Sequence, residues 1–230
     1  MTSEQYIASA KQGLINARSY LNTPNWRHGI SAVRTCISYV NAAQIMFNDS
    51  RLDERLWILN EVQQFSYNDL DAGGVKDLAT WCEIEYNRIL STNPSHVGAL
   101  RALGQAWLWK SQYWLAKVCH EDRSDDDDDV VERRRYTPNY VEARAALMPA
   151  VDFLARAADG ALRQNCLTGE LLALRAEACM SLGNVSPTRD AQVHFKTALR
   201  CLRSATMLPS YQLPNHLVQY LRENEHLLRM

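Results

Sequence analysis

Hydrophobic residues along most of this chain recur every three to four positions, which is the spacing of amphipathic helices, and strand-like alternation is hard to find. Turn and helix-capping residues separate the apolar stretches, for example at 23–25, 71–74 and 93–95. The pattern predicts eight long helices and a final one, over approximately 3–22, 25–48, 51–66, 75–92, 96–118, 139–158, 168–183, 188–207 and 214–229. Because the predicted loops are mostly short, we expect consecutive helices to pack as antiparallel neighbours.

The composition supports this all-α interpretation. Hydrophobic residues occupy 47% of the 230 positions, with six Trp and ten Tyr, so the chain has enough apolar surface to offset the entropy of folding. Only nine Gly and seven Pro interrupt it. One of them, Pro149, lies within the predicted helix 139–158 and is expected to kink it, because proline lacks the amide proton and clashes with the preceding turn.

Two stretches combine a small residue at an expected helix crossing with regularly spaced aromatic and Ala positions. In the first, a 34-residue repeat counted from Val97 places six residues on consensus positions, namely Leu100, Leu103, Gly104, Trp107, Tyr113 and Ala116. In the second, Ala176 lies on a helix that ends at Gly183, and the next helix supplies Ala191, Phe195 and Ala198 after about three inserted residues around Pro187. Both stretches resemble tetratricopeptide repeats.

This resemblance implies an all-α, antiparallel helix-hairpin solenoid with about four hairpins and a C-terminal helix, in which residues 1–230 form a single domain. Gly104 and Ala176 would let neighbouring helices approach closely. Side chains at the other consensus positions of the two repeats would fill the space between hairpins. They are Trp107, Tyr113, Ala116, Ala191, Phe195 and Ala198.

In tetratricopeptide repeats, side chains at particular first-helix positions face a concave groove. The matching positions in this chain are Arg101, Gln105, Leu108 and Trp109, then Glu170, Ala173, Glu177 and Met180, with Lys11 and Arg18 near the N-terminus. Trp109 is the expected anchor, because a large aromatic side chain on an exposed helix face often contributes strongly to an interface. Leu174 stands where a chaperone-tail clamp would have Asn, so we do not predict chaperone-tail binding.

An acidic segment interrupts the helical pattern at about 120–137. Residues 121–135 include five consecutive aspartates and carry a net charge of −4, against +3 for the rest of the chain. Adjacent carboxylates repel one another, so we expect a solvated, disordered insertion. Two functional alternatives stay open: a phosphoswitch at Ser124, which precedes the aspartates, and an acidic tether for a basic partner.

The sequence contains no G-x-S-x-G, P-loop, HExxH or glycine fingerprint, so catalysis has no support. The six cysteines form no C-x-x-C pair, and Cys119 with His120 beside Glu121 is more typical of a solvated helix end than of a metal site. We therefore predict no enzyme activity, metal, cofactor or small-molecule substrate. The net charge of −1 and the absence of long apolar runs give no reason to expect nucleic-acid or membrane partners, and a cytoplasmic or nuclear protein is expected.

Three functional hypotheses follow. The leading one is a non-catalytic adaptor or scaffold subunit that binds a peptide or helix of another protein in its concave groove. The second is a structural subunit of a larger multiprotein assembly. The third is an accessory subunit of an enzyme, resembling the α subunit of protein prenyltransferases, although the Trp-x-x-Arg-type repeat core of that family is not evident here. The same helical stack serves all three, so the sequence alone does not separate them.

Overall fold

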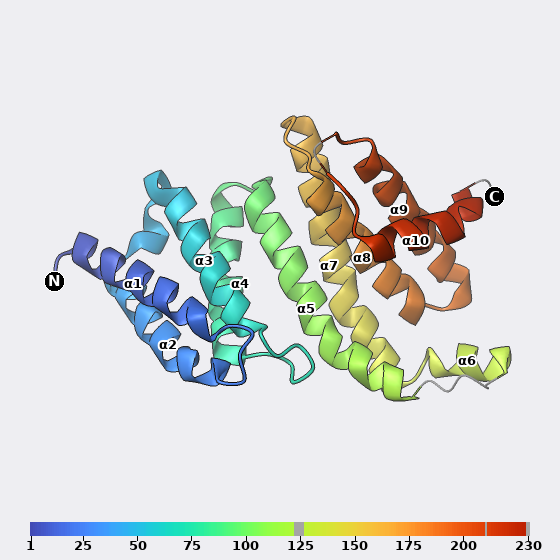
Figure 1. The fold of residues 1–230 in the computed structure, drawn as a ribbon, viewed down its shortest axis with the longest axis horizontal. Coiled ribbons are helices and arrows are strands. Elements are labelled where there is room, and N and C mark those ends of the chain that lie inside the picture. The colour runs from blue at the N-terminus through green and yellow to red at the C-terminus, as the bar shows by residue number, and fades with distance from the viewer. Residues whose placement is uncertain (122–126, 210, 229–230) are drawn as a thin grey trace. The chain divides into compact units, whose positions relative to one another are not determined.

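The computed structural model describes residues 1–121, 127–209 and 211–228. Within these ranges the chain forms ten α-helices and no strand, in agreement with the predicted all-α class (Figure 1). None of these helices combines the length and the apolar character needed to cross a membrane. The α-helices are α1 Ser3–Ala17, α2 Trp26–Ala43, α3 Leu52–Ser66, α4 Lys76–Thr92, α5 Val97–Glu121, α6 Asp128–Arg134, α7 Pro138–Arg163, α8 Gly169–Val185, α9 Thr188–Thr206 and α10 Asn215–Asn224.

Capping chemistry explains several helix starts. Thr2 and Gln5 form a reciprocal capping box at α1: the Thr2 hydroxyl accepts from the Gln5 amide at 3.3 Å, and the Gln5 side chain accepts from the Thr2 amide at 2.8 Å. Thr168 caps α8 by accepting a hydrogen bond from the amide of Leu171. Pro138 begins α7, at a position where the missing amide proton would have no helical partner. Of these starts, the one at Pro138 follows from the predicted turn at 137–139.

Contacts group the chain into two compact units, Met1–Pro94 and Ser95–Met230. The first unit contains α1 to α4, and the second contains α5 to α10. A single solenoid domain would divide into such units too, because each of its repeats contacts mainly its neighbours in sequence. This division therefore does not test the expected single domain spanning 1–230, which stays a prediction.

In the first unit, α1 packs against α2, and α3 packs against α4. Two of the ion pairs that link these helix pairs join residues separated by 43 positions. Lys11 of α1 pairs with Glu54 of α3, and Arg34 of α2 pairs with Asp77 of α4. Paired positions on α1 and α3 are therefore as far apart in the sequence as paired positions on α2 and α4.

In the second unit, α5 packs along α7, and α8 contacts both α7 and α9. The helices α5 and α7 approach closely at Gly104, where an added Cβ would lie 2.5 Å from Cγ of Leu154. Helix α7 contains Pro149 but is continuous from Pro138 to Arg163, so it extends beyond its predicted end at residue 158.

The C-terminal segment folds back onto α8 and α9. Leu217 of α10 is completely buried in an apolar cluster with Ala173 and Ala176 of α8 and Leu202 of α9. Partly buried side chains of the same segment pack against this cluster, namely Leu208, Tyr211, Leu213, Tyr220 and Leu221. Figure 1 shows α10, in red, crossing this part of the second unit. The final predicted helix is therefore part of the packing of α8 and α9.

Helix α5 differs from the repeat predicted to start at Val97. A 34-residue repeat consists of two helices and a turn, whereas α5 alone occupies 25 residues and ends at Glu121. Tyr113 and Ala116 therefore lie on the same helix as Gly104, and not on a second one. The reason is local: no Gly or Pro lies between residues 105 and 121, and strong helix formers such as Ala, Leu, Gln and Lys occupy much of this stretch.

The expected disordered insertion at 120–137 is partly helical. Ser124 and its neighbours in 122–126 lie outside the described residues, but Asp128–Arg134 forms α6. Glu132 accepts hydrogen bonds from the amide and hydroxyl of Thr188 at 3.2 and 2.7 Å, and Arg135 donates to the carbonyl of Ser186. These contacts, with basic residues at the end of α6 that favour its C-terminal dipole, join α6 and the residues after it to the start of α9. The expectation of a disordered insertion at about 120–137 stays a prediction.

Candidate partner-binding surfaces

A groove with a volume of about 390 Å³ runs along α1 beside the start of α3. Ile7 and Ile15 of α1 line it, but only Ile15, which is 47% exposed, contributes substantial apolar surface, because Ile7 is buried. Lys11, Arg51 and Glu54 supply charged groups along the same groove. This α1–α3 groove, defined by these five residues, therefore combines aliphatic and ionised side chains within one unit.

Glu54 is at the centre of the charges in the α1–α3 groove. Its carboxylate accepts a hydrogen bond from Lys11 Nζ at 2.9 Å and lies 2.7 Å from Nη2 of Arg51. Burial raises the pKa of Glu54, but the hydrogen bonds and charges of Lys11 and Arg51 outweigh burial and hold this pKa below its ordinary value. Lys11 also lies over the Trp57 ring, 5.8 Å from the ring centroid. Lys11 is therefore held in place by two side chains of α3.

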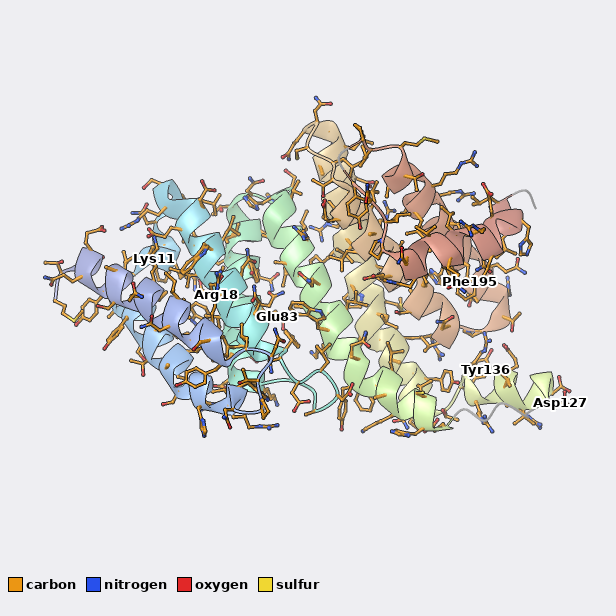
Figure 2. The ribbon with its side chains drawn as sticks, in the orientation of Figure 1. Lys11, Arg18, Glu83, Asp127, Tyr136 and Phe195 are labelled. Atoms are coloured by element: carbon orange, nitrogen blue, oxygen red, sulfur yellow. The ribbon has the colours of Figure 1, made fainter. Side chains whose placement is uncertain are left out.

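Arg18, the second basic residue predicted to face a groove near the N-terminus, lies directly after α1. It donates two hydrogen bonds to the buried carboxylate of Glu61 on α3, and these bonds raise the pKa of Arg18. Lys11 and Arg18 are labelled in Figure 2. Both predicted basic residues are thus engaged by acidic residues of α3, so a partner would meet ion pairs there and not free cations.

On α8, the predicted groove residues face the C-terminal segment of the same chain. Ala173 is buried in the cluster around Leu217, and Met180 packs against that cluster. Glu177 lies 3.6 Å from Nε2 of His216 on α10. The expectation that Ala173 and Met180 line an open groove is therefore wrong, because both pack in or against the apolar cluster that includes Leu217, whereas the Glu177 side chain stays 41% exposed. Glu170, at the start of α8, stays exposed.

On α5, the predicted groove residues are divided between surface and interior. Arg101 is exposed and has no ion-pair partner among the described residues, while Gln105 and Trp109 are half-buried. Leu108 is only 5% exposed and belongs to the core, which corrects its assignment to a groove. It lies one turn after Gly104, and residues four apart share a helix face, so Leu108 lies on the side of α5 that packs against α7.

The predicted packing alanines of α8 and α9 lie in the interior, and Phe195 is half-buried. Ala176 and Ala198 are fully buried in the cluster around Leu217, and Ala191 is also buried. The ring of Phe195 lies against Gly183, where an added Cβ would be 2.6 Å from a ring carbon. Small residues therefore allow close contact between α8 and α9.

Trp107, Tyr113 and Ala116 of α5 are only half-buried, unlike the interior positions expected for them. The Lys110 ammonium lies 4.1 Å from the centroid of the Trp107 ring, and the Lys117 ammonium lies 4.2 Å from that of Tyr113. The physical reason is that α5 is one long helix, so these side chains follow each other around a single, partly exposed surface.

Buried thiols and metal-ligand types give no sign of a reactive centre. Burial raises the pKa of Cys179 to about 12 and also raises the pKa of Cys201, so both thiols are protonated at neutral pH. The part of the chain that the structure describes contains no group of three or more His, Cys, Asp or Glu residues placed to hold a metal ion. Thiolate chemistry is therefore unavailable at these two residues near neutral pH.

Sequence reasoning missed the acidic partners on α3. Glu54 and Glu61 follow Lys11 and Arg18 by 43 residues in each case. This repeated spacing of opposite charges is the signal in the sequence, and it differs from the 34-residue period of the predicted repeat. The hydrophobic pattern of residues 214–229 predicts a helix but does not indicate which face Leu217 covers.

Acidification should weaken the first unit through Glu54. Its lowered pKa means that the carboxylate contributes stability above the ordinary pKa of the unfolded group, and that this contribution is lost as pH falls through the lower, folded pKa. We expect Glu54→Gln to reduce the free energy of unfolding by about 1 kcal/mol near pH 7 and by much less near pH 3. Urea unfolding at both pH values measures this. Asp53→Asn, at an exposed neighbour, is the control; equal losses for Glu54→Gln at both pH values would contradict the ion-pair explanation.

The described helices are compatible with a helical repeat fold. No protein-family model, curated protein or solved structure matches this chain.

Proposed function

We propose that this protein is a non-catalytic adaptor or scaffold subunit that binds a helical segment of a partner protein in the α1–α3 groove. In this proposal the chain folds as an antiparallel hairpin solenoid similar to tetratricopeptide repeats, and α1 and α3 are its inner helices. The 43-residue separation of the ion pairs supports stacked hairpins in the first unit. The partner is a protein, and the chain carries out no reaction itself.

The observation that carries this proposal is the packing of α10 against α8 and α9. A predicted groove face, containing Ala173 and Met180, holds an amphipathic helix that inserts Leu217 among apolar side chains. A polar contact flanks the apolar one, with Nε2 of His216 3.6 Å from the carboxylate of Glu177. An amphipathic helix laid into an apolar groove is a common mode of peptide recognition.

The α1–α3 groove offers similar chemistry to a helix from another protein. Ala8 and Ile15 provide exposed aliphatic surface, and Lys11 with Glu54 provides a charged edge. Among the described residues, its lining comes from α1 and the chain around the start of α3. We therefore expect the partner helix to carry aliphatic residues on one face and charged residues beside them.

Site-specific photo-crosslinking tests the proposal. A benzoylphenylalanine at position 15 lies in the α1–α3 groove, and the same residue at position 84 replaces an Ile that is also exposed but lies outside this groove. We expect one partner to be crosslinked from position 15 and not from position 84. Mass spectrometry of the crosslinked peptide then identifies the bound segment, which is synthesised for calorimetry.

The synthesised segment should bind the wild-type chain and lose about tenfold or more in affinity to Ile15→Asp, because a buried carboxylate would replace an aliphatic contact. Ile84→Asp is the matched control and should change the affinity less than about twofold. Crosslinking of equal yield from both positions, or a synthetic segment that binds Ile15→Asp as tightly as wild type, would exclude the α1–α3 groove as the binding site.

A further inference from the structure

A second cavity, of about 590 Å³, lies among the end of α7, the first half of α8 and the second half of α9. Its volume is within the range of about 300–1,000 Å³ that is usual for ligand-binding pockets. Two arginines from different helices line it, Arg175 of α8 and Arg200 of α9. This α7–α9 pocket belongs entirely to the second unit and shares no residue with the α1–α3 groove.

The charges in the α7–α9 pocket are not balanced. Arg175 lies near one carboxylate, that of Asp159, but the distance is 3.9 Å, and the Asp159 side chain is 62% exposed. The Nε atom of Arg175 is buried without a hydrogen-bond partner. Arg200 has no ion-pair partner among the described residues. Two guanidinium groups therefore face one solvated carboxylate, which leaves the pocket with a net positive charge.

The α7–α9 pocket also contains a hydroxyl group and apolar side chains. The Ser204 hydroxyl lines it and makes no hydrogen bond within the described structure. Leu162 is 63% exposed at the pocket, while Leu172 lies buried below. A guanidinium group binds carboxylates through directed hydrogen bonds, and exposed Leu favours an aliphatic neighbour. The lining thus suits an anionic group that carries an aliphatic group beside it.

We infer that the α7–α9 pocket binds an acidic peptide segment of a partner protein. The carboxylate of an Asp or Glu lies between Arg175 and Arg200, and an adjacent Leu, Ile or Phe of the peptide covers Leu162. The charge complementarity between two arginines and the acidic residue selects this occupant. The site is separate from the proposed function of the α1–α3 groove and does not depend on it.

Selection of random 12-residue peptides displayed on phage, with the full-length chain as bait, tests this inference. Enriched sequences should contain Asp or Glu within two residues of Leu, Ile or Phe. The most enriched peptide is then synthesised with a fluorescein label, and its affinity is measured by fluorescence polarisation. Enrichment without an acidic residue overturns the inference.

Charge variants then locate the bound peptide. Arg200→Glu should weaken binding by about tenfold or more, and Arg175→Gln should also weaken it, because each removes a guanidinium from the pocket. Arg203→Glu is the matched control, since Arg203 is exposed on the same helix but does not line the pocket, and it should change affinity less than about twofold. Equal weakening by Arg200→Glu and Arg203→Glu would show non-specific attraction and overturn the inference.

Two further arms separate the competing occupants. Replacing the aliphatic residue of the peptide with Gly should weaken binding; if affinity is unchanged and inorganic phosphate displaces the peptide, the pocket is a simple anion site and the inference fails. Ile15→Asp should leave the affinity unchanged. Loss of the peptide in Ile15→Asp would place it in the α1–α3 groove, which overturns this inference while supporting the proposed function. Thermal melts of every variant confirm that each is folded.

Discussion

Replacement of Gly104 with Leu is expected to lower the free energy of unfolding by about 3 kcal/mol, because the new side chain has no space between α5 and α7. An added Cβ would already lie 2.5 Å from Cγ and 2.9 Å from Cδ2 of Leu154, a fully buried residue. It would also lie 3.2 Å from the backbone nitrogen of Leu154, so a change of rotamer cannot relieve the contact and the helices must separate. Urea unfolding of both proteins measures the loss.

The same helix pair supplies a matched control. At Gly160 of α7 an added Cβ would meet Cγ2 of Val97 at 3.4 Å and the carbonyl oxygen of Ser95 at 3.5 Å, which are ordinary contacts. Gly160→Ala should therefore stabilise the chain by about 0.5–1 kcal/mol, through the higher helix propensity of Ala. Gly104→Ala should be destabilising in spite of that gain. Similar effects of the two Ala substitutions would contradict close packing at Gly104.

Local sequence chemistry predicted the helices well, because each helix depends on nearby residues. Thr2 with Gln5 and Thr168 are capping residues that can be recognised without tertiary structure, and α1 and α8 begin beside them. Gly104 was also identified from its small size at an expected helix crossing, and the structure places Leu154 against it. The class of the fold and the positions of the helices therefore followed from short-range patterns.

The surfaces were harder to predict, because exposure depends on segments that are distant in sequence. Ala173 and Met180 have the spacing of groove residues, but they are covered by Leu217 and its neighbours, about 40 residues later. Lys11 is predicted to face a groove, and the structure shows that Glu54 holds it. Arg175 and Arg200 lie on different helices, and no local pattern indicates that α8 and α9 bring them to one pocket.

The α10 helix has the features of a segment that can separate from the rest of the second unit. It has only ten residues, and isolated helices of that length are marginal in water. Leu217 is its one fully buried side chain among the described residues, and the polar contact of His216 with Glu177 is long, at 3.6 Å. Its attachment to α8 therefore depends mainly on Leu217 and the partly buried residues around it.

Leu217→Ala is expected to detach α10, because removal of a fully buried Leu side chain costs about 2–5 kcal/mol and few other contacts hold this helix. Hydrogen exchange should become faster across 215–224, while the amides of α5 and α7 keep their protection. The uncovered face with Ala173 and Met180 should then bind an added synthetic peptide spanning 211–228, which the wild-type chain should bind at least about tenfold more weakly.

Val218→Ala, at the neighbouring exposed position, is the control and should leave exchange unchanged. If α5 and α7 unfold together with α10, then α10 is an inseparable part of the core. In that case the packing of α10 would no longer support the proposal that a partner helix binds in a groove of this chain.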